Sequence, residues 1–424
     1  MTKRIPRLMV AGALAACMFG TGAARAGDTV TKWNEIMQAT VTAPGGEPAS
    51  NPNRQTRWGA IVQLAVFEAV NAIVGDYEPY LGGIDAPAWA STDAAVIAAA
   101  HCTLVALRPN HTDALNALRD ASLEAIPNGP AKDAGISVGV EAAEAMLLHR
   151  ADDGWDAVVP YTPGTEPGDF QPLPTQSALL PGWGQVRPFG LPEDVSEFRL
   201  PPPPALGSGR YADDYNEVKL LGSLNSPFRP QDRTDVAKFY AATSPVAVFN
   251  SAARQVSAAQ GKTLSENARI FAVLAMAMAD TAIAMWDTKY HYSFWRPQAA
   301  IRGGDTDGND KTDADPDWLP LIPTPAHPSY ASGHASVSGS AARVLDHVFG
   351  KDGHAVTLTN PGLPAIVLAY TAWDEVTDDV DDARIYGGIH FRFDQKQGAR
   401  LGHDVGKYIF ANYLRSADEL GGDE

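Results

Sequence analysis

The sequence predicts an all-α protein built from helical bundles. Apolar residues recur at the helical period of about 3.6 residues in long stretches of both halves of the chain. Few stretches alternate apolar and polar residues as half-buried strands do, and no repeat of fixed length is present. Helices without a companion sheet bury their apolar stripes against one another, so bundles are the simplest architecture.

Residues 1–26 predict a signal peptide. Three basic residues precede an uncharged apolar run at 8–24, and Ala24-Arg25-Ala26 is a small-x-small cleavage signal. A membrane anchor is the alternative, but the run is short for a membrane span. We expect export to the periplasm or medium after cleavage near Ala26. The mature chain would keep one cysteine, Cys102, and could not form an internal disulfide.

The net charge limits the possible partners. The formal charge is −17, and removal of the four basic groups in residues 1–26 makes it about −21. Such a surface disfavours nucleic acid and anionic membranes. We therefore expect no nucleic-acid partner and no stable membrane insertion, and an anionic ligand would need a local cationic pocket.

Residues 27–225 predict an N-terminal helical region that includes a Pro/Gly-rich coil. The helices are expected at 57–74, 93–107, 110–126 and 131–150. Residues 151–210 are rich in Pro and Gly and predict long irregular coil draped over the helices. An interdomain linker is the alternative, but Trp183, Phe189 and Leu191 favour packing.

Residues 226–424 predict a C-terminal helical domain. The stretch 265–295 is its strongest helix, and the charges of Arg269, Asp280 and Asp287 within it favour a core helix over a membrane span. The other helical stretches, including one just before this domain, are 213–224, 233–243, 335–349 and 390–414.

An acidic loop, residues 303–318, spaces oxygen-bearing side chains as a calcium loop does. These side chains are Asp305, Asp307, Asn309, Asp313 and Asp315. The loop is no EF-hand, because Gly308 is misplaced and no Glu closes it. A solvated acidic loop is the favoured interpretation, and Ca²⁺ binding the weaker one.

Three short segments concentrate cations and histidines. Lys289 and Arg296 are seven residues apart, so we expect them on one face of a helix that Pro297 ends. The second segment is Ser332-Gly333-His334, before a predicted helix. The third contains Arg384, His390 six residues on, and Asp394 four residues after that. Each segment alone is typical of surface charge, a helix cap or a salt bridge.

Together the three segments predict an oxyanion site. Lysine supplies a point charge and arginine a planar fork, and a glycine at a helix start lets backbone N–H groups approach an anion. Lys289, Arg296 and Arg384 would nearly neutralise a trianion. His334 and His390 are the natural pair for attack or ligation and for proton transfer. Asp394 could orient the His390 ring if that segment is helical.

The motifs Lys-x6-Arg-Pro, Ser-Gly-His and Arg-x5-His, in this order over residues 285–400, resemble the vanadium-dependent haloperoxidase and type 2 acid phosphatase (PAP2) superfamily. The N-terminal half resembles its bacterial haloperoxidase branch. The resemblance implies one vanadate per chain, with His390 as the vanadium ligand, His334 as acid–base and Lys289 polarising bound peroxide. The residues it implies for the vanadate oxygens are Lys289, Arg296, Ser332, Gly333 and Arg384.

Four further positions refine the resemblance. Trp286 matches a tryptophan that haloperoxidases carry beside the cofactor, and His327 matches a histidine of bromide-oxidising members. A core aromatic and a loop histidine are the alternatives. Ala331 replaces the usual Pro before Ser-Gly-His, which weakens loop rigidity. Ala383 replaces the Ser that phosphatases usually carry, which favours a haloperoxidase.

The expected function is therefore oxidation of halide, with bromide favoured, by hydrogen peroxide to a hypohalous-acid equivalent that reacts with a small organic acceptor. A secreted PAP2-type acid phosphatase, with His390 as the attacking group in a phosphohistidine mechanism, is the first alternative. A protein that sequesters phosphate or vanadate without turnover is the second, although such a binder needs no pair of opposed imidazoles.

Overall fold

The structure, a computed structural model, describes residues 27–46 and 49–420 and is mostly helical. The predicted signal peptide lies outside the described residues. The helices are α1 Thr29–Thr42, α2 Pro52–Val74, α3 Thr92–Leu107, α4 Thr112–Glu124, α5 Pro130–His149, α6 Gly209–Leu221, α7 Gln231–Ala242, α8 Pro245–Gln260, α9 Leu264–Tyr292, α10 Pro297–Arg302, α11 Gly333–Phe349, α12 Trp373–Tyr386, α13 Arg392–Asn412 and α14 Ala417–Leu420. The all-α prediction is confirmed.

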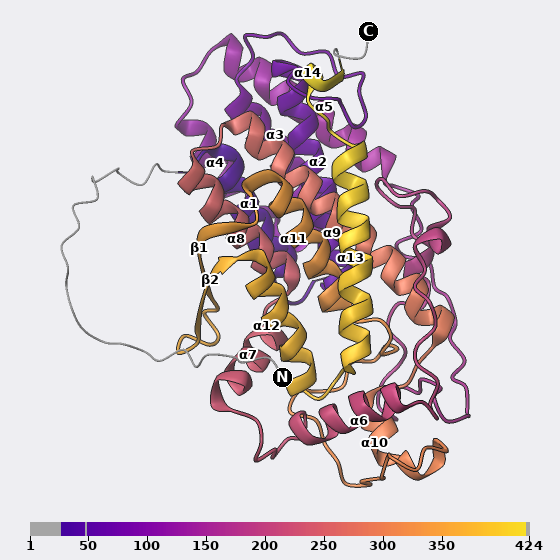
Figure 1. The fold of residues 1–424 in the computed structure, drawn as a ribbon. Helices are drawn as coiled ribbons and strands as arrows, with labels where there is room; N and C mark the ends of the chain where they lie inside the picture. The colour runs from indigo at the N-terminus through magenta and orange to yellow at the C-terminus, as the bar shows by residue number, and fades with distance from the viewer. Residues whose placement is uncertain (1–26, 47–48, 421–424) are drawn as a thin grey trace, which may run out of the picture.

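The helix α9 forms the centre of the bundle (Figure 1). It packs against α2, α11 and α13. Its first turn carries a capping box, in which Thr263 Oγ1 accepts from the Glu266 N–H and Glu266 Oε2 accepts from the Thr263 N–H. It ends where Ser293 takes a left-handed conformation with φ 46°. The apolar stretch predicted as the strongest helix, residues 265–295, thus forms most of a core helix.

Two helices of the described residues, α2 and α9, are long and apolar enough to cross a membrane. However, 83% of the apolar window of α2 and 94% of that of α9 are buried inside the protein. Both therefore serve as core helices here, as predicted for α9.

The Pro/Gly-rich coil after α5 packs along one side of the bundle, on the right in Figure 1. Trp183, Phe189 and Leu191 are buried, as predicted. The fully buried carboxylate of Asp280 on α9 anchors this coil. It accepts hydrogen bonds from the backbone N–H groups of Phe189, Gly190 and Leu191, at 2.6, 2.7 and 2.8 Å.

Asp280→Ala is expected to lower the free energy of unfolding by about 3 kcal/mol or more, because three buried N–H groups lose their acceptor. Chemical denaturation followed by circular dichroism measures this. Asp287→Ala is the matched control on the same helix. Its carboxylate pairs with Arg199 in a partly exposed position, so about 1 kcal/mol or less is expected. Equal losses would contradict the anchoring role.

One hairpin was not predicted from the sequence. β1 Asp352–Thr359 pairs antiparallel with β2 Val367–Ala372. Val356 and Leu358 are buried and alternate with exposed neighbours, so the strand signal was present over only a few residues. The hairpin contacts α8 and α12 and adds no second sheet layer.

The proposed division at residue 225 stays a prediction. The boundary falls in the loop between α6 and α7. Buried residues from both sides of it, among them Trp58 of α2 and Phe271 of α9, belong to one hydrophobic cluster. The core that positions the site is therefore shared by the two regions.

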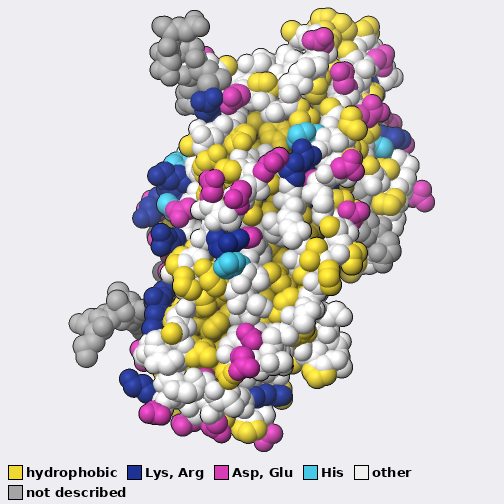
Figure 2. Space-filling view, turned by 90° about the vertical axis from the view of Figure 1, so that its right-hand side faces the viewer, with side chains coloured by type: hydrophobic (Ala, Val, Ile, Leu, Met, Phe, Trp, Pro, Cys, Tyr) yellow, Lys and Arg dark blue, Asp and Glu magenta, His cyan; other side chains and the backbone are white. Residues whose placement is uncertain are grey.

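Acidic and basic side chains are interspersed over the face shown in Figure 2, with hydrophobic side chains between them. The cations predicted for the site lie elsewhere, because Lys289, Arg296 and Arg384 are all buried. The positive charge of the candidate site is thus an interior feature of an acidic protein.

Candidate active site

The structure brings the predicted residues together from five segments. Lys289 lies near the end of α9 and Arg296 just before α10. The Ser332–His334 segment opens α11, Arg384 lies near the end of α12, and His390 precedes α13. A cavity of about 80 Å³ lies among them, and its lining includes Trp286, His327, Gly333, His334, Arg384 and His390. Lys289, Arg296, Ser332 and Asp394 are buried beside it.

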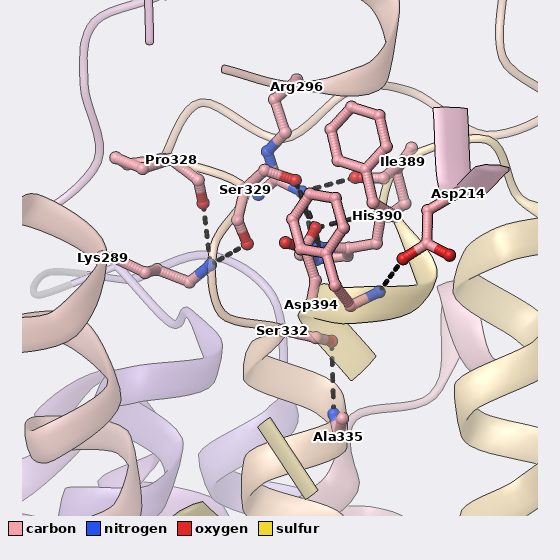
Figure 3. Close-up of polar contacts among 12 residues, drawn as sticks. Asp214, Lys289, Arg296, Pro328, Ser329, Ser332, Ala335, Ile389, His390 and Asp394 are labelled. Carbon is pink, nitrogen blue, oxygen red and sulfur yellow. Dashed lines mark hydrogen bonds and ion pairs between the residues drawn. The ribbon is translucent and has the colours of Figure 1, made fainter. Parts of the chain in front are cut away.

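His390 is held by Asp394 and Ser329 (Figure 3). His390 Nδ1 lies 2.8 Å from Asp394 Oδ2, which also accepts from Ser329 Oγ at 2.6 Å and from the Phe391 N–H at 3.1 Å. An ionised carboxylate only accepts, so Nδ1 carries the ring proton. His390 Nε2 is then left with a lone pair, the form in which imidazole binds a metal.

The Arg296 guanidinium contacts both His390 and His327. Its Nη1 donates to the Ile389 carbonyl at 2.8 Å and lies 3.1 Å from His390 Nε2. Its Nη2 lies 2.8 Å from His327 Nδ1, and its Nε donates to the His327 carbonyl at 2.7 Å. Both imidazoles therefore face the guanidinium with a lone pair. Burial lowers the Arg296 pKa to about 9.

Lys289 is fully buried and donates to the carbonyl oxygens of Pro328 at 2.7 Å and Ser329 at 2.9 Å. Burial, and then the charge of Arg296, hold the pKa of Lys289 well below its ordinary value, while Asp394 opposes the shift. An anion nearby would favour the charged ammonium. The Nζ atom also lies 5.9 Å from the Trp286 ring centroid.

The start of α11 lets an anion come close to its backbone. Ser332 Oγ caps the helix by accepting from the Ala335 N–H at 3.3 Å, which leaves the hydroxyl hydrogen available for donation. A Cβ added to Gly333 would lie 2.9 Å from the terminal methyl of Met285, which would have to shift, so glycine keeps the backbone open here. The N-terminal end of α11, with its partial positive charge, thus reaches the cavity.

Arg384 donates from Nη1 to the Tyr240 carbonyl at 3.0 Å. Its buried Nε has no hydrogen-bond partner within the described part of the chain. Burial lowers the Arg384 pKa to about 10. An unpaired buried donor beside a cavity is a position where an anion would be stabilised.

The three histidines of the site are held neutral. Burial lowers the pKa of His334 well below its ordinary value, and Arg384 lowers it further. Burial and then Arg296 do the same for His327 and His390. Burial raises the pKa of Asp394 to about 6, against the hydrogen bond from Ser329. A neutral imidazole lining the cavity, such as His334, can accept a proton.

Two structural expectations for the site were wrong. Arg296 is not on the helix that carries Lys289, because α9 ends at Tyr292 and Pro297 begins α10 instead of ending α9. Proline suits the first position of a helix, where no N–H is needed. His390 likewise precedes α13, so its bond to Asp394 forms across the helix start instead of along a helical turn.

Some site residues were not found from the sequence. Ser329 had no motif, and only its place three residues before Ser332 could have suggested it. Asn53 and Thr56 of α2 and Val246 of α8 form a wall of the cavity. No spacing rule connects Asn53 and Thr56 with site residues more than 200 places later in the sequence, or Val246 with the motifs that follow it. Trp286 and His327 do lie together, with ring centroids 4.8 Å apart.

The acidic loop 303–318 has no evident cation site. Asp307 accepts from the Asn309 N–H and from Thr312 Oγ1, and Asp305 accepts from the Ala314 N–H. Within residues 27–46 and 49–420, no group of three or more His, Cys, Asp and Glu side chains could hold a metal ion. The carboxylates instead bond the loop's own donors.

The residues present fit a tetrahedral oxyanion. Three buried cations face one buried carboxylate, Asp394, so the cluster carries excess positive charge. The unpaired Arg384 Nε and the bare backbone at Gly333 add donors beside the cavity. Vanadate and phosphate both have this shape and charge, and the lone pair of His390 Nε2 suits the bonding of either central atom.

Comparison with known proteins agrees with this geometry. Residues 269–419 match the family model of the VCPO second helical-bundle domain. The chain is 27% identical over 183 residues to vanadium chloroperoxidase of Curvularia inaequalis, which is 35% of this chain and 29% of that protein. It is 29% identical over 109 residues to the vanadium-dependent bromoperoxidase of Corallina pilulifera, covering 22% of this chain and 18% of that protein. The matches thus span less than a third of each relative's length.

Two solved structures resemble the whole fold. A bacterial vanadium-dependent iodoperoxidase superposes with a TM-score of 0.75 at 23% identity, covering 92% of this chain and 95% of its own. A bacterial vanadium-dependent chloroperoxidase gives 0.74 at 16% identity, covering 91% and 97%. Residues 269–419 therefore match the second helical-bundle domain of the vanadium chloroperoxidase type, and the whole chain has the helical-bundle fold of these bacterial structures.

Proposed function

We propose that the protein is an exported vanadate-dependent haloperoxidase, which oxidises halide with hydrogen peroxide to a hypohalous-acid equivalent. One observation carries the proposal: three buried cations surround two imidazoles, and a carboxylate fixes the proton of one of them. Relatives named as chloro-, bromo- and iodoperoxidases support the reaction class. Bromide is the proposed halide, because His327 occupies the position at which bromide-oxidising members carry histidine.

The proposed roles follow from the contacts. His390 Nε2 would hold vanadium, with Asp394 and Ser329 fixing the ring. The oxygens would be held by Lys289, Arg296, Ser332, Gly333 and Arg384. When bound, vanadate supplies a Lewis acid that activates hydrogen peroxide. For Lys289 and Arg296 this requires part of their present hydrogen bonding to carbonyl oxygens to be exchanged for the anion. Arg296 Nη1 would also give up its 3.1 Å contact with His390 Nε2.

His334 is the proposed proton acceptor for incoming peroxide. It lines the inner cavity and also an open pocket of about 450 Å³. Pro52 and Ser244 border both spaces as well. The outer pocket is lined by neutral amide and hydroxyl side chains such as Gln38 and Asn360. Peroxide, halide and the small organic acceptor would approach His334 through it.

The overall reaction balances with one proton. Halide gives two electrons to the O–O bond of hydrogen peroxide. One oxygen leaves as water, and the other stays bonded to the halogen as hypohalous acid. His334 and Lys289 are placed to move and stabilise the charge that develops on the peroxide oxygens. No redox change of the protein is needed.

Vanadium-free protein is expected to gain bromide-oxidising activity when orthovanadate is added, and phosphate should compete. Halogenation of a phenol dye by bromide and peroxide measures this.

The protein should be recovered from the exported fraction, where mass spectrometry is expected to find Gly27 as the first residue. Hydrolysis of p-nitrophenyl phosphate without halogenation would instead support the acid phosphatase.

A further inference from the structure

The N-terminal end of α2 forms a wall of the inner cavity. Pro52, Asn53 and Thr56 all line it. Asn51 caps the helix by accepting from the Arg54 N–H at 3.0 Å, and the first turn contains no acidic residue. The partial positive charge at the start of this 23-residue helix is therefore not offset by a neighbouring carboxylate of that turn.

Asn53 adds an unsatisfied donor at the same place. Its side chain is 3% exposed, and its Nδ2 has no hydrogen-bond partner in the described ranges of the chain. Thr56 differs, because its hydroxyl already donates to the Asn53 carbonyl at 2.8 Å. A buried amide without a partner is destabilising unless a ligand or water satisfies it.

The surroundings of Asn53 suit a large monatomic anion. The lining of the cavity also includes apolar side chains, among them Val246, Met285, Trp286 and Val337. The cationic side of the cavity, with Arg384, supplies long-range attraction. At about 80 Å³, the cavity holds roughly five to eight water-sized volumes, which is room for more than one small ion. A halide needs few directed bonds and gains from polarisable, apolar contacts.

We propose that Asn53 and the start of α2 form a halide-binding subsite, in which the Asn53 amide donates a hydrogen bond to the halide that is to be oxidised. The proposal rests on the haloperoxidase function and adds a positioning residue from the N-terminal region. It explains why the amide is buried without a protein partner. It also places the halide in the cavity that Trp286, His334 and His390 line.

Asn53→Leu keeps the side-chain volume and removes the donor. The KM for bromide is expected to rise about tenfold or more, while the KM for peroxide and vanadium retention change less than threefold. Asn53→Asp should raise the bromide KM further, because a carboxylate repels the halide. Thr112→Val is the control, since Thr112 does not line the cavity and its hydroxyl is bonded locally to the Pro109 carbonyl at 2.7 Å; it should leave the bromide KM within twofold.

A second measurement needs no turnover. Iodide quenching of tryptophan fluorescence, taken as the difference between the protein and Trp286→Phe, reports halide near Trp286 in vanadium-free and vanadate-loaded protein. Asn53→Leu should weaken this quenching severalfold. An unchanged bromide KM with unchanged quenching overturns the subsite. A parallel loss of vanadium retention would assign Asn53 to the vanadate cage instead. Absence of halide oxidation in the unaltered protein would refute the proposed function, whereas the quenching would still test the subsite.

Discussion

His390→Ala is expected to abolish vanadate retention and, with it, halide oxidation. The imidazole presents a lone pair at Nε2, and the bond from its opposite nitrogen, Nδ1, to Asp394 at 2.8 Å orients this lone pair. Loss of a group that only orients a metal ligand typically lowers affinity 10–100-fold. Removal of the ligand itself should exceed about 100-fold. Elemental analysis after gel filtration, together with the dye assay, measures both effects.

Two variants make this result specific. Asp394→Asn keeps the imidazole but weakens its orientation, so an intermediate loss of about 10–100-fold is expected. His403→Ala removes an exposed histidine of α13, whose side chain is 53% exposed, and should bind vanadate as the unaltered protein does. Unchanged vanadium content in His390→Ala would remove this residue from the coordination role.

The fold could be predicted because its helices satisfy local rules. α9 has an apolar sequence, a capping box and a left-handed stop at Ser293, and the first two are visible in the sequence. The hairpin β1–β2 was not predicted because its alternation of buried and exposed residues spans only a few positions. Short elements depend more on tertiary contacts than on their own pattern.

The order and spacing of charges within the motifs predicted which residues meet, but not how the backbone brings them together. The seven-residue spacing of Lys289 and Arg296 suggested one helix, whereas the chain turns at Ser293 and starts α10 at Pro297. The spacing of two residues in the sequence limits how far apart their side chains can lie, but several backbone conformations of the segment between them satisfy that limit. Asn53 could not be predicted for a different reason. It belongs to no motif, and packing of α2 on α9 brings it to the cavity.

The second large effect is expected for His334→Ala, which should lower kcat by about 100- to 10,000-fold while vanadium retention changes less than tenfold. His334 lines both the inner cavity and the outer pocket. Burial and the charge of Arg384 keep its pKa low, so at neutral pH the ring is ready to accept a proton from peroxide. Among the described residues that line the inner cavity there is no carboxylate, and the other two imidazoles, of His327 and His390, already face the Arg296 guanidinium at 2.8 and 3.1 Å, so they are poorer proton acceptors.

His347→Ala is the matched control for His334→Ala, because His347 lies on the same helix, is exposed and stacks on Phe410 at 4.6 Å. It should keep full activity. Imidazole added to His334→Ala should restore part of the turnover, since the deletion enlarges a cavity that already opens toward the outer pocket. A rescued rate separates proton transfer from structural support, because a collapsed site would not respond to imidazole. If His334→Ala instead lost vanadium as completely as His390→Ala, the histidine would be a ligand and the peroxide proton would need another acceptor.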